Sequence, residues 1–168
     1  MHETLFPAEP TPLSTDEWYT PQWLFRAAGV TFDLDVCAPL DPMLRTCPAH
    51  TYYTVHDDGL TQPWHGLVWM NPPYSRAEPW VQRWAQHPDA LAILPALPEV
   101  AWRGILLRAA AAVALIAADF GRPDGSRARL RWPLLLAGRG AGADLVPRIA
   151  TADRYADGAY HVRPEVTP

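Results

Sequence analysis

The chain has 168 residues, 49% of them hydrophobic, and a formal net charge of -4. This length and apolar content suit one domain with a buried core and exclude an intrinsically disordered chain. The acidic balance argues against a protein that coats nucleic acid without sequence preference, but it is compatible with a local basic face.

Residues 1–17 are rich in proline and threonine, and we expect a flexible N-terminal segment there. The pattern over residues 20–30 predicts a short helix in which Thr20 is the cap, Pro21 takes the first helical position and Gly29 ends the helix. The folded domain is therefore expected to begin near residue 18.

Apolar and acidic side chains alternate over residues 31–38, which predicts a strand that presents Asp33 and Asp35. Residues 39–63 are punctuated by prolines and are expected to be mostly loop. A short apolar strand over 66–70 then leads into the segment Asn-Pro-Pro-Tyr-Ser.

The rest of the folded region alternates helical and apolar strand patterns. Helices are expected over 75–87 and 99–110, strands over 90–96, 112–118 and 132–138, and a polar loop over 121–131. This alternation predicts a single α/β domain over residues 18–140 with a mostly parallel sheet, followed by a mostly irregular tail over 141–168. Ligands bind such sheets at the carboxyl ends of strands, so the two polar segments that follow strands are expected to share one crevice.

Two cysteines, Cys37 and Cys47, lack the spacing of a zinc site, so we expect no metal and interpret both as free thiols of a reducing compartment. The first ten residues carry neither a basic nor an apolar leader, and the longest apolar run, 109–118, is too short to cross a bilayer. These observations predict a cytoplasmic protein with no membrane partner.

Asn71 is the only asparagine in the chain, and it stands directly before two prolines. Pro72 and Pro73 fix two φ angles and remove two backbone donors, and the residue before a proline is held in an extended conformation. The side-chain oxygen of Asn71 and the carbonyl of Pro72 are therefore expected to be rigid acceptors, and Tyr74 adds an aromatic face beside them.

Two such acceptors suit a planar NH₂ group with two hydrogens to donate. The exocyclic amine of a nucleobase is a poor nucleophile because its lone pair is delocalised. Binding both hydrogens localises that lone pair and stabilises the positive charge that develops as the amine attacks. An aromatic face would also hold a base rotated out of a duplex. A plain strand-ending turn is the alternative, since Asn, Pro and Ser are common turn formers.

Several segments of the chain keep the order of a known family: YTPQWLF, FDLDVCAP, YYTVHDDGL, PWHGLVWMNPPYS, WVQRW and LPALPEVAW, over residues 19–102. In this order they resemble the phage-type DNA N-6-adenine methyltransferases, and the similarity extends more loosely through residue 138. The resemblance implies a Rossmann-like fold, S-adenosylmethionine as the cofactor, and methyl transfer to N6 of adenine in double-stranded DNA.

Carried onto this chain, the resemblance makes Asn71, Pro72, Pro73 and Tyr74 the catalytic motif. It implies that cofactor binding involves Thr20, Pro21, Asp33, Asp35, Cys37, Asp57 and Asp58. Within this set, Asp35 would bind the methionine amino group, and the Thr-Pro pair would approach the methionine carboxylate. The residues alone also allow a solvated strand face for Asp33, a plain helix cap for Thr20 and Pro21, and a simple Asp-Gly turn at 57–59.

The chain departs from the family at three positions, where Leu97, Pro98 and Val100 replace an arginine and two threonines; these changes put activity rather than fold in question. The basic loop that would bind DNA holds Arg122, Arg127, Arg129 and Arg131. A solvated hairpin tip is the alternative for these arginines. No segment is long enough for a separate recognition domain, so we expect a short target, a partner or a second subunit in a homodimer.

Two other functions stay open from the sequence. The same tetrapeptide occurs in methyltransferases of RNA bases and of glutamine side chains, because an amide NH₂ and an adenine NH₂ present similar hydrogens. The changes at 97, 98 and 100 also fit an inactive prophage-derived remnant that binds DNA.

Overall fold

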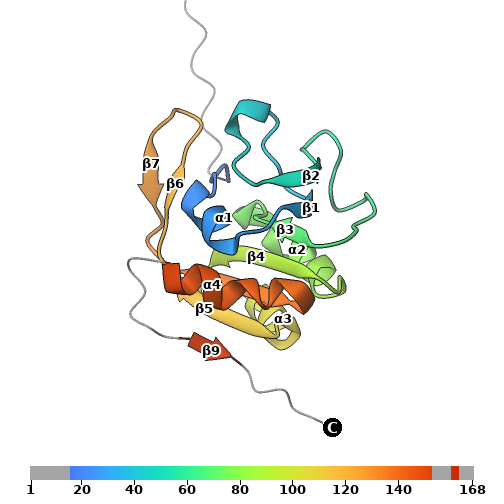
Figure 1. Ribbon diagram of the computed structural model, residues 1–168, viewed down its shortest axis with the longest axis vertical. Coiled ribbons are helices and arrows are strands. Elements are labelled where there is room, and N and C mark those ends of the chain that lie inside the picture. The colour runs from blue at the N-terminus through green and yellow to red at the C-terminus, as the bar shows by residue number, and fades with distance from the viewer. Residues whose placement is uncertain (1–15, 153–159, 163–168) are drawn as a thin grey trace, which may run out of the picture.

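The computed structural model describes residues 16–152 and 160–162. Its centre is a seven-stranded sheet in the order β2-β1-β3-β4-β8-β5-β9, and a two-stranded hairpin, β6–β7, stands beside it (Figure 1). The strands are β1 (Phe32–Asp35), β2 (Ala49–Tyr52), β3 (Val68–Met70), β4 (Ala90–Pro95), β5 (Ala112–Ile116), β6 (Asp119–Gly121), β7 (Arg127–Arg129), β8 (Leu134–Arg139) and β9 (Tyr160–Val162). The helices are α1 (Gln22–Ala28), α2 (Ala77–Trp84), α3 (Ala101–Ala109) and α4 (Leu145–Ala152), with 3-10 turns η1 (Pro42–Leu44), η2 (Tyr74–Arg76) and η3 (Gly140–Gly142).

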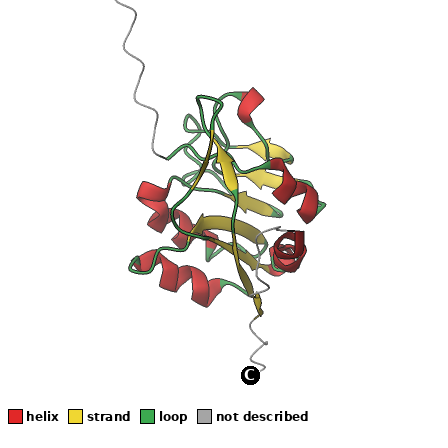
Figure 2. Cartoon of the chain, turned by 90° about the vertical axis from the view of Figure 1, so that its left-hand side faces the viewer, coloured by secondary structure: helices red, strands yellow, loops and turns green. Residues whose placement is uncertain are grey.

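Helices cover both faces of the sheet (Figure 2). α1 packs with α4, and α2 packs with α3. Side chains of β4 alternate between the two resulting cores: Leu91 and Ile93 join the core that contains α1 and α4, while Ala92 and Leu94 join the core that contains α2. A strand buried on both faces is apolar at every position, which is why β4 is recognisable in the sequence.

Most strands of the sheet run in one direction. β1 pairs in parallel with β2 and β3, and β3 pairs in parallel with β4. β8 lies between β4 and β5 and is antiparallel to both, and β9 is antiparallel to β5. The prediction of an α/β fold with a mostly parallel sheet is confirmed. The chain goes from β1 to β2 on one side and returns as β3 on the other, so the strand order switches at β1 and a crevice is expected at the carboxyl ends of β1 and β3.

The first helix, α1, begins one residue later than the sequence predicts. Pro21 is the N-cap residue of α1, with ψ at 142°, rather than its first helical residue, and no side chain caps the helix. Gly29 ends α1 as predicted, because its φ of 67° is a left-handed conformation that glycine adopts without strain. The hydroxyl of Thr20 is used elsewhere, as an acceptor for Asn71.

Two segments expected to be loops contain strands. β2 lies within residues 39–63 and, among the described strands, pairs only with β1, at the edge of the sheet. Its sequence, Ala-His-Thr-Tyr, is half-exposed and lacks the apolar run of the inner strands. β7 lies within residues 121–131 and pairs with β6, with Phe120 buried on β6 and two exposed arginines on β7. Sparse burial explains why neither strand was predicted.

The prediction of a mostly irregular tail is wrong for residues 145–152, which form α4. α4 buries one apolar stripe against α1, formed by Leu145, Val146, Ile149 and Ala150. This stripe is short and lies among glycines and alanines, so it is hard to recognise in the sequence. Gly142, which precedes α4, lets the backbone there lie directly against β4: a Cβ on Gly142 would lie 2.1 Å from the Ala90 carbonyl oxygen. The expected flexible segment at 1–17 lies outside the described residues except for its last two.

No helix among residues 16–152 is long and apolar enough to cross a membrane.

Candidate active site

A crevice of about 750 Å³ lies at the carboxyl ends of β1 and β3. Asp35, the last residue of β1, is paired with Trp69 of β3, and Asn71 follows β3 directly. The topology therefore brings together two segments that are 36 positions apart in the chain. The predicted site residues that line this crevice are Thr20, Asp35, Cys37, Asp58, Asn71 and Pro73.

Asp35 is a buried carboxyl group at the floor of the crevice, with only 3% of its surface exposed. Its Oδ1 accepts a hydrogen bond from the backbone N–H of Cys37 at 3.1 Å. Burial raises the pKa of Asp35 to about 7, against the opposing effects of that N–H and of Arg45. No cation forms a salt bridge with Asp35 among the described residues. A buried acid of this kind fits a ligand that brings its own positive charge.

Both cysteines also lie at the crevice, and both are free thiols. Burial, followed by the nearby charge of Asp35, raises the pKa of Cys37 and of Cys47. Both effects favour the protonated thiols over the thiolates.

The amide of Asn71 is held by two acceptors. Its Nδ2 donates to the backbone carbonyl of Trp18 at 2.7 Å and to Oγ1 of Thr20 at 3.2 Å. A carbonyl can only accept, so the NH₂ group must face Trp18, and the amide orientation is fixed. Oδ1 is left as an acceptor, and no described residue donates a hydrogen bond to it.

The two prolines differ in their surroundings. Pro72 is buried, and no described backbone N–H donates to its carbonyl. Pro73 lines the crevice, and its carbonyl accepts from the Arg76 N–H at 3.1 Å, which closes η2. The Pro-Pro step thus turns the chain from β3 into η2 and α2.

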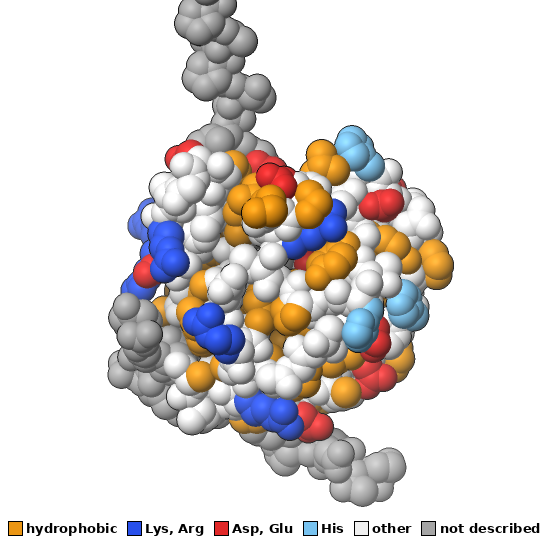
Figure 3. Space-filling model, turned by 45° about the horizontal axis from the view of Figure 1, so that its top comes forward, with side chains coloured by type: hydrophobic (Ala, Val, Ile, Leu, Met, Phe, Trp, Pro, Cys, Tyr) orange, Lys and Arg blue, Asp and Glu red, His pale blue; other side chains and the backbone are white. Residues whose placement is uncertain are grey.

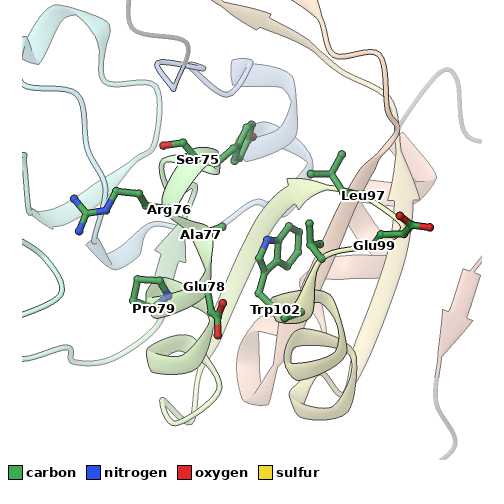
Figure 4. Close-up of a pocket in the computed structure, with 11 residues that line it drawn as sticks. Ser75, Arg76, Ala77, Glu78, Pro79, Leu97, Glu99 and Trp102 are labelled. Atoms are coloured by element: carbon green, nitrogen blue, oxygen red, sulfur yellow. The ribbon is translucent and has the colours of Figure 1, made fainter.

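Tyr74 does not line the crevice but a second cavity of about 500 Å³. Figure 4 shows this cavity between η2 with the start of α2 and the start of α3, where Leu97 and Trp102 lie opposite Ala77. The Tyr74 hydroxyl is buried without a hydrogen-bond partner among the described residues, and burial raises its pKa. Arg76, the last residue of η2, lines both cavities, so the two cavities adjoin at this turn.

Two of the predicted cofactor-binding acids have structural roles outside the crevice. Asp33 points away from it, because its Oδ2 accepts from the Leu67 N–H at 2.7 Å and fixes the start of β3. Asp57 is exposed, and its Oδ2 accepts from both the N–H and the hydroxyl of Thr54 at 2.8 Å. Those bonds lower the pKa of Asp57. Like these two acids, Pro21 does not line the crevice.

Of the two neighbouring acids Asp57 and Asp58, it is Asp58 that lines the crevice. It has a φ of 55°, the only positive φ among the described non-glycine residues, and aspartate tolerates this better than most side chains. Gly59 follows, and a Cβ there would lie 2.3 Å from the Val36 carbonyl oxygen. The Asp-Gly turn is therefore pressed against the loop after β1.

The four predicted DNA-binding arginines separate into different roles. Arg122 donates to the Glu17 carbonyl at 2.8 Å, and its Cζ lies 4.2 Å from the centroid of the Trp18 ring. Arg129 forms a salt bridge with Asp119 at 2.7 Å. Arg127 and Arg131 are exposed. Figure 3 shows arginines gathered on the side of the molecule where the β6–β7 hairpin lies.

Residues that the sequence did not single out complete the crevice. They include Asp16, Trp18, Leu40, Val55, Leu60 and Trp80. Trp80 of α2 is buried in the core and also lines the crevice. We call residues 16–20 the strap. Thr20 was singled out from the sequence, but the contacts that Asp16, Glu17 and Trp18 make with the rest of the molecule were not predicted.

Within residues 16–152, no three His, Cys, Asp or Glu side chains are placed to hold a metal ion.

Comparison with known proteins gives two results. The family model of DNA N-6-adenine-methyltransferase (Dam) matches residues 10–134. A 73-residue stretch is 40% identical to the DNA N-6-adenine-methyltransferase of Haemophilus phage HP1 (strain HP1c1), and it spans 40% of each chain. No solved structure matches.

Proposed function

Because the chain belongs to the DNA N-6-adenine-methyltransferase family, we propose that it transfers a methyl group from S-adenosylmethionine to N6 of adenine in double-stranded DNA. The observation that carries the proposal is the position of Asn71. Its amide oxygen is an oriented acceptor at the same crevice as a buried acid that has no salt bridge among the described residues. We further propose that the sheet, with its switch at β1, is that of a Rossmann-like methyltransferase.

The crevice fits the cofactor in size and chemistry. Its volume lies within the usual range for small-molecule sites. Asp35 would hold the ammonium of the methionine part, and Asp58 would bind the adenosine part. Thr20 accepts from Asn71, so its own hydroxyl proton is available to the methionine carboxylate. The cofactor supplies an activated methyl group on a sulfonium, and no metal is needed for that transfer.

The reacting amine would be bound by the Asn-Pro-Pro-Tyr turn. The Asn71 amide oxygen and the Pro72 carbonyl accept its two hydrogens and stabilise the charge that develops on nitrogen. The second cavity is the proposed place for the flipped adenine, with Tyr74 as a stacking surface that contributes roughly 1–3 kcal/mol. Leu97, where the family usually has arginine, lines this cavity and makes that wall apolar.

DNA would approach the side of the hairpin. Arg127 and Arg131 are exposed there, while Arg122 and Arg129 are already engaged within the protein. Two exposed arginines give a small electrostatic contact, so a homodimer that presents two hairpins to one duplex is part of the proposal.

A methylation assay with a labelled donor tests the proposal. Duplexes with and without adenine, an RNA of the same sequence and a glutamine peptide are compared, with Asn71→Ala as the control variant. Label is expected on adenine of the duplex alone. Label on RNA or peptide, or donor binding by calorimetry without any transfer, would refute it.

A further inference from the structure

The strap, residues 16–20, is bonded to both ends of the Asn-Pro-Pro-Tyr-Ser turn. Its Trp18 carbonyl and its Thr20 hydroxyl accept from the Asn71 amide at 2.7 and 3.2 Å. At the other end of the turn, the carboxylate of Asp16 accepts from both the N–H and the hydroxyl of Ser75. The strap therefore acts as a brace along the turn.

The hairpin holds the strap from the opposite side. Tyr19 and Gly121 exchange two backbone hydrogen bonds, at 3.0 and 2.9 Å, so the strap extends the hairpin at β6. The Arg122 guanidinium donates to the Glu17 carbonyl and lies over the Trp18 ring. An arginine on the basic hairpin is thus bound to the residue whose carbonyl orients the Asn71 amide.

We infer that Thr20 is a positioning residue for Asn71, and that Arg122 anchors the strap instead of binding a DNA phosphate. A rotation of the Asn71 amide by half a turn would place Oδ1 against the Trp18 carbonyl, where two acceptors repel. Loss of the Thr20 hydroxyl removes one of the two bonds that prevent it. Release of the strap removes both. This inference goes beyond the proposed function, but its catalytic part rests on that function.

The single asparagine makes the orientation directly measurable. Asparagine labelled with ¹⁵N at its side chain gives one NH₂ resonance pair in this chain. Thr20→Val, which keeps the shape but removes the hydroxyl, is expected to shift one proton of the pair and to speed its exchange with water. Thr20→Ser keeps the hydroxyl and is expected to leave the pair near its original position. Unmoved resonances in Thr20→Val would overturn the inference.

Kinetics supply a second readout. Removal of one hydrogen bond of about 0.5–1.5 kcal/mol is expected to lower kcat by about 2- to 12-fold in Thr20→Val, with restoration in Thr20→Ser. Thr20 also lines the cofactor crevice, so the substitutions are repeated in the Asn71→Ala background. If Thr20 acts on transfer through Asn71, its loss lowers kcat no further there. An equal loss of kcat in both backgrounds would contradict a positioning role.

Arg122→Gln and Arg127→Gln form a matched pair, because each removes one charge from the same hairpin. In the absence of DNA, Arg122→Gln is expected to shift the Asn71 resonances and Arg127→Gln is not. With DNA, Arg122→Gln should lower kcat, whereas Arg127→Gln should mainly raise KM for DNA. Arg122→Lys, which keeps the charge without the planar contact on Trp18, serves if Arg122→Gln does not fold. Identical behaviour of Arg122 and Arg127 variants would refute the anchor.

The two proposals fail in different ways. Wild-type protein that methylates nothing, while Thr20→Val still shifts the Asn71 resonances, would refute the proposed function and support the orientation of the amide by the strap.

Discussion

Replacement of Asp35 by asparagine should make the ligand-free protein more stable at neutral and alkaline pH. Asp35 is buried and has no salt-bridge partner among the described residues, and burial raises its pKa from 3.8 to about 7. The folded state therefore holds a proton on Asp35 at pH values where the unfolded chain has released it. The resulting contribution to stability is complete below pH ~4 and is lost as the pH rises through ~7.

The size of this effect follows from the two pKa values. A difference between 3.8 and about 7 corresponds to ~4 kcal/mol of unfolding free energy at pH 8. In a chain of this length the Asp35→Asn variant should then unfold on the order of 10 °C higher than wild type at pH 8. The two proteins should unfold together near pH 4. The amide oxygen of asparagine can still accept from the Cys37 N–H, so the fold is retained.

Urea unfolding of both proteins between pH ~2 and 8 measures this difference. Asp57→Asn is the matched control, because Thr54 lowers the pKa of Asp57 and the sign is reversed. That variant should be less stable than wild type at neutral pH, and the difference should disappear as the pH falls through the pKa of Asp57. Parallel stability curves for Asp35→Asn and wild type would show that the carboxyl group is not held in an apolar environment.

Proton release on cofactor binding provides a further test of Asp35: calorimetry near pH 6.5 in buffers of different ionisation enthalpy should detect a proton released as the ammonium binds, and Asp35→Asn should bind weakly without this release. Asn71→Ala should lower turnover by roughly 10²–10³-fold with little change in cofactor affinity, as measured by single-turnover methylation and calorimetry. Gly142→Ala should lower the free energy of unfolding, measured in urea, by about 2–4 kcal/mol because the new Cβ meets a backbone carbonyl. Gly104→Ala within α3 should raise it by about 1 kcal/mol, because there the new Cβ meets only the flexible end of Arg108. Arg127→Gln should weaken DNA binding at all sequences and reduce the salt slope of log K by about 1 in a fluorescence titration.

The inner strands and the site turn were predictable because local sequence determines them. β3, β4 and β5 are apolar runs, and the Pro-Pro step after β3 marks a rigid bend whatever its surroundings. The shared crevice of Asp35 and Asn71 followed from a general rule for parallel sheets. These features need only the periodicity of side chains and the stereochemistry of proline.

Other features depend on contacts that the sequence pattern does not reveal. Asp33 and Asp35 are two positions apart on one strand and look equivalent, yet one fixes Leu67 and the other faces the crevice. The place of Tyr74 on the far side of the turn depends on how η2 begins. Thr20 was singled out from the sequence, but its bond to Asn71 was not predicted. The Trp18 contact with Asn71 has no sequence signal because it uses a backbone carbonyl, which every residue carries.

The antiparallel strand β8 lies between β4 and β5 in the sheet but follows both in the chain, so the sheet cannot be completed until β8 has been synthesised. Among the described strands it alone lies between these two. A nascent chain that has reached residue 133 carries two apolar strands with unpaired edges, which invite aggregation until residues 134–139 emerge and insert between them. The family match ends at residue 134, where β8 begins. A fragment cut at that point would hold every proposed catalytic group and still lack the strand that closes its sheet.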